Sequence, residues 1–287
     1  MEESYKKAAD KLGLGNRIEA ETQLLASGFT SVNLEGIAPF DDSIASFDYQ
    51  TNQLIKSNWQ ARTELHPGMF PGPLASIRKF AVEDGTLNFA LKRSRFDIFD
   101  GLKQEMPSRL DITEIPLDRD LCLYLCTGAV TITAPEESYP DGAIIFGIRH
   151  SRHAIGPGNS NCLPSGLVNP DKDRLLIGDS TSRSLLSIRL TILRELMEET
   201  SIRDYKQLEY LGLVYEGYMA PGITIAVRLT VDSTMNKIRK TIINSDNESE
   251  SYHFIANNPE AVRDFVAKYP PTPHSAAMLA LHFATSS

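Results

Sequence analysis

The sequence RELMEE at residues 194–199 closes the most regular helical pattern of the chain, a stretch that extends over 182–200. Apolar residues recur there at three- and four-residue spacing, which is typical of a helix with one buried face. Residues 179–182 include several side chains able to cap a helix N-terminus. The pattern therefore predicts an amphipathic helix that packs on a core and carries a charged edge.

Three carboxylates share one stripe of this expected helix. Glu195, Glu198 and Glu199 stand at i, i+3 and i+4, where like charges repel and cost a few tenths of a kcal/mol per pair. A hard divalent cation would turn this cost into a gain, because such cations prefer carboxylate oxygens. Arg194 lies four residues before Glu198 and can pair with it. The simpler alternative is a solvated acidic face with one salt bridge.

Two separated pieces of the chain resemble one known family. The pattern Arg-Glu-x-x-Glu-Glu at 194–199 is similar to the second half of the Nudix box, and Leu-Pro-Ser-Gly at 163–166 resembles the Leu-Pro-Gly-Gly loop that leads into that box. The resemblance implies the α/β class, as a Nudix α/β/α sandwich with a mixed β-sheet. It also implies a Mg²⁺ site, with Mn²⁺ as the alternative metal. The implied metal ligands are Glu195, Glu198, Glu199 and the carbonyl oxygen of Gly166.

The chain departs from the Nudix pattern in its spacing and at single positions. About 14 residues, within 170–184, are inserted between Gly166 and Arg194, and we expect them to form a surface loop. Leu186 stands where the family has a Glu, so we expect a helix-orienting contact to be lost. Ser201 stands where the family ends the helix with Gly. A Ser in the left-handed conformation of that position costs about 1 kcal/mol.

The insertion itself resembles one branch of the family, the UDP-glucose and UDP-galactose pyrophosphatases. That branch also has an N-terminal helix bearing a Trp, followed by a hairpin, which Trp59 and residues 76–92 resemble. The resemblance implies Mg²⁺-dependent hydrolysis of a nucleoside diphosphate sugar to a nucleoside monophosphate and a sugar 1-phosphate. The partner is then a nucleotide-sugar substrate.

The resemblance also suggests which residues act in the reaction. Glu199 is the first candidate for the general base, with Glu198 beside it, and Glu248 or Glu250 of a later loop is the second. The simpler reading of the last two is an ordinary pair of loop carboxylates. The candidate substrate-binding residues are Arg149 and Arg152, which can pair with phosphate, and Tyr215 and Tyr218, which can stack on a base or sugar. For these residues the alternatives are a solvated basic loop and half-buried core tyrosines.

Two further functions remain open from the sequence. One is hydrolysis of a different nucleoside diphosphate derivative, such as ADP-ribose. The other is a degenerate Nudix domain that binds a nucleotide or a protein without hydrolysing it, which the departures at Leu186, Ser165 and Ser201 suggest. The retained acidic triplet favours an enzyme, because a binding module has no need of three crowded carboxylates.

The composition limits the partners. The 287 residues have a formal net charge of −8 and a hydrophobic fraction of 41%, so there is no broad positive field for nucleic acid or an anionic membrane. No apolar run approaches the length of a membrane span, and the charged N-terminus lacks a leader pattern. We expect a cytoplasmic protein whose three cysteines, Cys122, Cys126 and Cys162, are reduced and packed. Nothing in the sequence indicates an oligomeric state.

Near residue 115 a stretch with Pro and Asp precedes a strongly apolar run, and this change in composition predicts two regions. They are an N-terminal accessory helix and β-hairpin region (1–115) and a Nudix domain (116–287). In the first we expect a helix over 51–63 and a hairpin of 76–82 and 86–92. In the second, the expected strands are 121–132, 142–149, 208–216, 223–231 and 252–255, and the expected later helices are 259–268 and 274–284. Residues 156–166 are expected to be an irregular loop.

Overall fold

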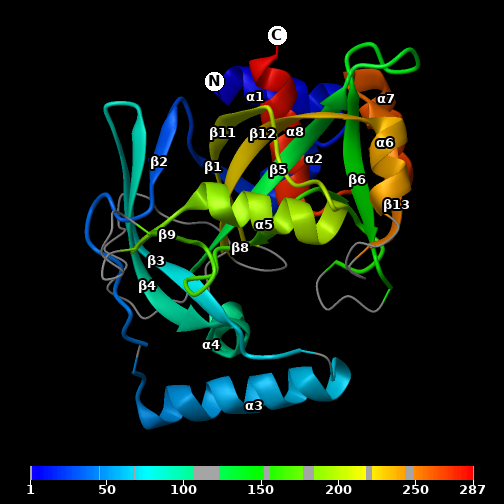
Figure 1. The fold of residues 1–287 in the computed structure, drawn as a ribbon. Coiled ribbons are helices and arrows are strands. Elements are labelled where there is room, and N and C mark those ends of the chain that lie inside the picture. Colours follow the sequence, from blue (N-terminus) through cyan, green and yellow to red (C-terminus); the bar gives the residue numbers. More distant parts are fainter. Residues whose placement is uncertain are drawn as a thin grey trace.

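The structure is a computed structural model that describes residues 2–44, 46–67, 69–105, 123–151, 156–176, 184–217, 222–242 and 249–286. Its elements form a mixed sheet with helices on both faces, which confirms the expected α/β class and layered arrangement (Figure 1). Within these ranges, no helix combines the length and the apolar character needed to cross a bilayer.

One sheet of eleven strands organises the described chain. Its main path is β1 (Thr22–Ala26), β11 (Gln207–Glu216), β12 (Gly222–Thr234), β5 (Tyr124–Ala134), β3 (Pro73–Glu83), β4 (Thr86–Arg95) and β2 (Ser31–Asn33). Pairing with β5 or with its neighbours adds β6 (Ala143–Arg149), β7 (Ser160–Cys162), β8 (Ser165–Leu167) and β13 (Ser249–Ala256). The β12–β5 and β2–β4 pairs are parallel and the others are antiparallel, so the sheet is mixed.

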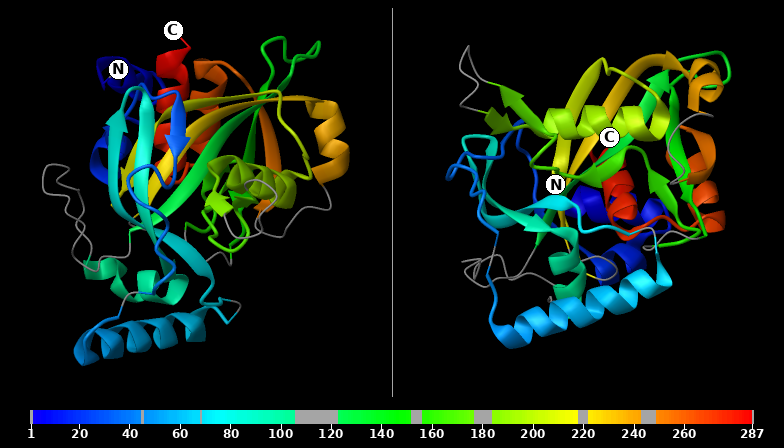
Figure 2. Two further views of the ribbon diagram at one scale, coloured as in Figure 1. Left: turned by 60° about the vertical axis from the view of Figure 1, so that its left-hand side comes forward. Right: turned by 60° about the horizontal axis from the view of Figure 1, so that its bottom comes forward.

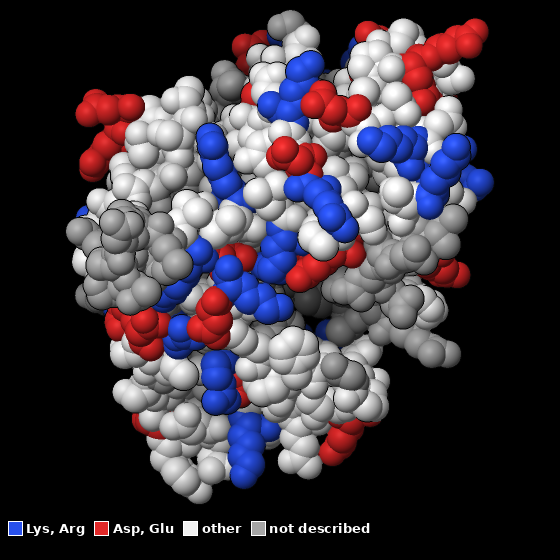
Figure 3. Space-filling model, in the orientation of Figure 1, with Lys and Arg blue, Asp and Glu red and all other residues white. Residues whose placement is uncertain are grey.

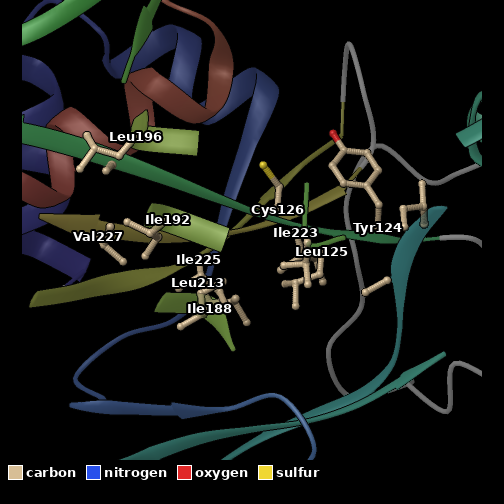
Figure 4. Packing of buried hydrophobic residues seen from close by; sticks show 14 of the residues in the cluster. Tyr124, Leu125, Cys126, Ile188, Ile192, Leu196, Leu213, Ile223, Ile225 and Val227 are labelled. Atoms are coloured by element: carbon tan, nitrogen blue, oxygen red, sulfur yellow. The ribbon is translucent and has the colours of Figure 1, made fainter. Parts of the chain in front are cut away.

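One face of the sheet is covered by α5 (Ile188–Thr200), with α6 (Met235–Thr241) beside it. The apolar stripe of α5, formed by Ile188, Ile192 and Leu196, is buried against β-branched and leucine side chains of β5, β11 and β12 (Figure 4). Burial of such side chains stabilises the fold by about 2 kcal/mol each. This packing fixes the helix on the sheet and leaves its charged edge at the rim.

The opposite face is covered by α8 (Pro273–Thr285), which is buried over almost its whole length. The helices α1 (Glu2–Lys11), α2 (Gly15–Glu21) and α7 (Pro259–Lys268) join it in a second apolar cluster. The two ends of the chain therefore lie together on this face, as both views in Figure 2 show.

The helix α3 (Tyr49–Leu65) lies below the rest of the molecule and packs on α4 (Phe96–Leu102), which is followed by the short 3-10 helix η1 (Lys103–Glu105) (Figure 1). Aromatic rings connect α3 to the sheet, because Trp59 contacts Phe96, Phe96 contacts Phe99, and Phe99 meets Tyr124 edge-on with ring centroids 4.5 Å apart. Through these ring contacts, Trp59 anchors α3 to β5.

Most predicted elements are confirmed, with boundaries shifted by a few residues. The expected hairpin is β3 and β4, and its turn places Asp84 and Gly85 at positive φ, as an Asp-Gly turn requires. The strand predicted to start at 121 begins at Tyr124 among the described residues. Cys126 and Cys162 are buried and free, and burial raises the pKa of the Cys126 thiol to about 12. Cys122 and the expected boundary near 115 lie outside the described residues, although one sheet includes strands from both sides of that boundary.

Two predictions of secondary structure are wrong. The helix α5 begins at Ile188, not near 182, because Leu185 and Leu186 belong to β10 (Ser184–Leu186), which pairs with β9 (Arg174–Leu176). The loop expected over 156–166 contains β7 and part of β8, which form because β6 and β5 offer free strand edges to pair with. Neither short strand has a local sequence signal.

The buried His282 of α8 predicts how stability depends on pH. Its Nδ1 accepts a hydrogen bond from Arg228, and burial followed by the charge of Arg228 lowers the pKa of His282 to about 3. Below an unfolded pKa of about 6.5, only the unfolded chain takes up this proton, so stability falls as the pH falls towards 3. Between pH 7 and pH 5 this residue should contribute a loss of about 2 kcal/mol.

Urea unfolding at both pH values measures this loss. In His282→Gln, whose side-chain oxygen can still accept from Arg228, the difference between pH 7 and pH 5 should shrink by about 2 kcal/mol. An unchanged difference would show that His282 does not have the lowered pKa.

Candidate metal and substrate site

The helix α5 brings the acidic stripe to the rim of the sheet. Its N-cap is Ser187, and it ends at Ser201, which adopts the left-handed conformation (φ 59°) expected for the family's Gly position. Because the apolar stripe faces the sheet, Glu199 at the border of that stripe is buried, whereas the side chain of Glu198 is 42% exposed. The three carboxylates therefore lie in different environments.

Arg194 is the cation at the centre of this rim. Its Nη1 donates to Glu195 Oε1 at 2.6 Å and to Glu198 Oε2 at 3.2 Å, and its Nη2 donates to the carbonyl oxygen of Leu167 at 3.0 Å. Burial by itself lowers the pKa of the guanidinium, but hydrogen bonds to Asp173 and the charge of Glu195 outweigh this effect and raise the pKa above its ordinary value. Arg194 is therefore a permanent positive charge on the acidic rim.

Asp173, in the insertion, is the fourth acid. It is fully buried, and its carboxylate forms two parallel hydrogen bonds with Arg194, from Nε to Oδ1 at 2.9 Å and from Nη2 to Oδ2 at 3.0 Å. The expectation that 170–184 forms a surface loop is therefore wrong at this position. Leu186 is buried in β10, and Arg194 has a buried carboxylate partner in the insertion.

Glu195 and Glu199 both face Ser165 and Gly166, the first residues of β8, which directly follow the bend at Leu163 and Pro164. This point of the chain is called the Ser165–Gly166 turn. Glu199 Oε2 accepts a hydrogen bond from the backbone N–H of Ser165 at 3.2 Å. Gly166 lies so close to Glu195 that a Cβ atom added there would fall 2.0 Å from the carboxylate carbon. The fold thus brings the two sequence pieces that resemble the Nudix pattern into contact, 29 to 34 positions apart.

The oxygen atoms of these residues are of the kind that binds a hard divalent cation. Carboxylates and a backbone carbonyl are the oxygen ligands that Mg²⁺ and Mn²⁺ accept, and the absence of a Cβ at Gly166 lets the Glu195 carboxylate lie on the turn. In the described part of the chain, however, no three His, Cys, Asp or Glu side chains converge closely enough to hold a metal ion. Glu198 turns to Arg194 on the exposed side, so two of the three carboxylates gather at the turn.

A buried polar network supports the turn from the α8 side of the sheet. His274 Nδ1 lies 2.9 Å from Glu216 Oε2, and its Nε2 lies 2.9 Å from Asn161 Oδ1 and 3.3 Å from Ser165 Oγ. Both ring nitrogens thus face oxygen atoms, and the Asn161 oxygen is closer to Nε2 than the Ser165 hydroxyl. The array therefore holds the turn in place and does not activate Ser165 as a nucleophile, which would need an unprotonated Nε2 directed at Oγ.

Tyr124 lies next to this network. It pairs with Gly222 across the β5–β12 ladder, and a Cβ atom at Gly222 would meet the Tyr124 ring at 2.3 Å, so the ring lies over the glycine. Burial foremost, and then the charge of Glu216, raises the pKa of Tyr124 well above its ordinary value, while Arg149 opposes the shift. Arg149, at the end of β6, is therefore electrostatically coupled to Tyr124.

The other predicted site residues differ in their location and in their burial. Arg149 is half-buried at the end of β6, and Glu250 is exposed at a bulge of β13, beside the residue that pairs with Arg149. Tyr215 has no exposed surface, so its ring is not presented to a ligand in this structure. Arg152, Tyr218 and Glu248 lie outside the described residues. Across the face that carries α5, acidic and basic side chains are interspersed (Figure 3).

Sequence reasoning missed Asp173, Glu216 and His274. Asp173 lies in a polar stretch, Asn-Pro-Asp-Lys-Asp, where nothing distinguishes it from its exposed neighbour Asp171. Glu216 had a weak signal, because a carboxylate at the end of an apolar strand is unusual in a core position. His274 has no partner at metal-ligand spacing in the sequence, so no local pattern distinguishes it.

The matches to known proteins come from solved structures. No family model matches the sequence, and no curated protein does. Similar solved structures include the MutT protein from Methanosarcina mazei Go1, at 15% identity and a TM-score of 0.38 over 57% of this chain and 94% of that chain. Others are the Nudix hydrolase RenU from M. smegmatis (14%, TM-score 0.37, 57% and 86%) and DR0079 from Deinococcus radiodurans (14%, TM-score 0.38, 54% and 80%). At these TM-scores the likeness supports no conclusion about function.

The buried Glu216–His274 pair leads to a prediction about stability. In Glu216→Ala, the buried Nδ1 of His274 loses the carboxylate that it faces, and leaving a buried polar group without its partner costs about 2 kcal/mol. Glu209→Ala is the matched control, since Glu209 is on the same strand and pairs with Arg228 but its side chain is 40% exposed. That pair should cost below about 1 kcal/mol. Denaturant unfolding measures both, and equal losses would contradict the supporting role of the pair.

Proposed function

We propose that this protein is a Mg²⁺-dependent pyrophosphohydrolase of the Nudix type that cleaves a UDP-glucose-like nucleoside diphosphate sugar. The observation that carries the proposal is that Glu195 and Glu199, one turn apart on α5, both lie against the Ser165–Gly166 turn. Two motifs that resemble the Nudix pattern in the sequence are thus neighbours in space. This arrangement collects oxygen ligands where a metal-bridged pyrophosphate would bind.

The proposed metal ligands are Glu195, Glu198, Glu199 and the carbonyl oxygen of Gly166. When bound, Mg²⁺ neutralises charge on the pyrophosphate oxygens and lowers the pKa of an attacking water. In the reaction, water adds to one phosphorus atom and the P–O–P bridge breaks, giving UMP and a sugar 1-phosphate. The protein must therefore supply a proton acceptor and hold the anionic substrate.

Glu199 is the proposed proton acceptor. Its Oε2 is oriented by the Ser165 N–H, and its burial limits the positions that its carboxylate can take. A fixed carboxylate beside the reacting water is what general-base catalysis requires. Glu250, exposed on β13 beside the partner of Arg149, is the second candidate, together with Glu248.

Arg149 is the proposed contact to the substrate phosphates. It lies at a strand end, half-buried and close enough to Tyr124 to affect the pKa of that tyrosine. A guanidinium there can pair with two phosphate oxygens at once. The preference for a UDP-sugar rests on the resemblance of the insertion and of the N-terminal region to that branch of the family.

A binding module without hydrolytic activity is the alternative from another class. It is favoured by one observation, that within the described ranges the acidic side chains do not converge into a metal-binding group of three. ADP-ribose, or another nucleoside diphosphate derivative, is the alternative substrate within the enzyme class.

A substrate panel tests the proposed reaction. With Mg²⁺, UDP-glucose or UDP-galactose should give UMP and sugar 1-phosphate, followed by ³¹P NMR, and EDTA should stop turnover. Glu199→Gln should lower kcat by about a hundredfold or more, because it removes the proton acceptor. The exposed Glu209→Gln is the control and should retain full activity. Lack of turnover of every UDP-sugar overturns the preferred substrate, and turnover of ADP-ribose alone supports the alternative.

Gly166 provides a test of the metal site that does not depend on substrate. In Gly166→Ala the new Cβ collides with the end of the Glu195 side chain, which is flexible, so the protein should fold but hold Glu195 away from the turn. Titration calorimetry with Mn²⁺ should show an affinity at least about tenfold weaker. Gly166→Ala/Glu195→Ala should bind Mn²⁺ no more weakly than Glu195→Ala alone. Wild-type affinity in Gly166→Ala would place the metal elsewhere.

A further inference from the structure

We propose that Asp173 is a positioning residue that aims the Arg194 guanidinium and, through it, the Glu195 and Glu198 carboxylates. The inference rests on the proposed function, because it assigns these carboxylates to a divalent cation. It adds a residue from the insertion, a segment whose length alone pointed to a branch of the family. Arg194 links Asp173 to the helix carboxylates, because it donates hydrogen bonds to Asp173 and to both Glu195 and Glu198.

The hydrogen bonds of Arg194 account for every donor that it has. A guanidinium carries five N–H groups in a fixed plane, and five oxygen atoms accept from it. These acceptors are Asp173 Oδ1 and Oδ2, the carbonyl oxygen of Leu167, Glu195 Oε1 and Glu198 Oε2. Because the group is planar and rigid, fixing one edge on Asp173 determines where Nη1 points, and Nη1 is the atom that holds both helix carboxylates.

Asp173 is itself held from several sides. Its Oδ2 accepts from the backbone N–H of Asn169 at 2.8 Å and from the Thr191 hydroxyl at 2.9 Å, and its carbonyl oxygen accepts from the N–H of Ser187. The insertion therefore clamps the N-cap residue of α5, its first turn and Arg194 together. A side chain with no exposed surface and filled acceptors has little freedom to move.

Charge balance gives Asp173 a second effect. Arg194 pairs with three acids, Asp173, Glu195 and Glu198, and two of its hydrogen bonds compensate the buried charge of Asp173. Without that charge the guanidinium would be attracted more strongly to Glu195 and Glu198 and would compete with a cation for their oxygen atoms. Asp173 thus keeps Arg194 from neutralising the carboxylates that the metal needs.

The test is Mn²⁺ binding by titration calorimetry to the full chain carrying Asp173→Asn. This change keeps the shape of the side chain but removes its charge and places an NH₂ group towards Arg194. We expect Mn²⁺ affinity to fall at least about tenfold, as for other residues that orient metal ligands. Asp171→Asn is the control, because Asp171 is in the same insertion and its exposed carboxylate pairs with Arg93 at the surface, away from Arg194. Its affinity should equal that of the wild type.

A double variant separates positioning from general destabilisation. Arg194→Lys keeps the positive charge but cannot form the paired hydrogen bonds to Asp173. If Asp173 acts through Arg194, then Asp173→Asn/Arg194→Lys binds Mn²⁺ no more weakly than Arg194→Lys alone. If the two losses multiply, Asp173 acts by another route and the inference is overturned.

The outcomes distinguish this inference from the proposed function. Wild-type protein that binds no Mn²⁺ overturns the proposed function and the inference with it, whereas Mn²⁺ binding that Asp173→Asn leaves unchanged overturns the inference alone. Should Asp173→Asn fail to fold, Thr191→Val takes its place, since it removes one neutral donor to Asp173 and keeps the side-chain shape. We expect a loss of a few-fold there, and wild-type affinity in that folded variant overturns the inference.

Discussion

The five hydrogen bonds of Arg194 are the constraint on which the site depends. Three carboxylates on one helix, with a fourth buried beside them, would repel one another and the apolar core that they border. One planar cation pairs with three of them, Asp173, Glu195 and Glu198, and it joins α5 to the insertion through Asp173 and to β8 through the carbonyl oxygen of Leu167. The place of Asp173 beside α5 and the direction of the Glu195 and Glu198 side chains are therefore set by the same group.

Much of the fold could be predicted, because its strands and helices carry their own signals. The β-branched runs of β5, β11 and β12 and the Asp-Gly turn between β3 and β4 specify structure locally. Residues 184–186 carry no such local signal. Leu185 and Leu186 fit the helical spacing of α5 equally well, and only pairing with β9 makes them a strand. The short strands β7 and β8 likewise depend on partners distant in sequence.

The candidate site divides in the same way. The acidic stripe and the Leu-Pro-Ser-Gly turn are local patterns, so their residues could be selected from the sequence. Asp173 and His274 act through partners that the sequence does not indicate. Asp173 lies 21 positions before Arg194, and His274 lies 109 positions after Ser165. Only the folded sheet shows that a polar residue of the insertion is buried and that His274, at the start of α8, lies beside Ser165.

The meeting of the two chain ends affects how the molecule can form. The edge strand β1 pairs with β11, and α1 packs on α8, so early segments need partners that lie far along the sequence. During synthesis α1 remains without this partner until α8 has left the ribosome, and contacts between distant segments form slowly. Closure of the α8 face therefore waits for α8, and it completes the layer that supports the Ser165 turn. Assembly of the candidate metal and substrate site is in this way tied to synthesis of α8.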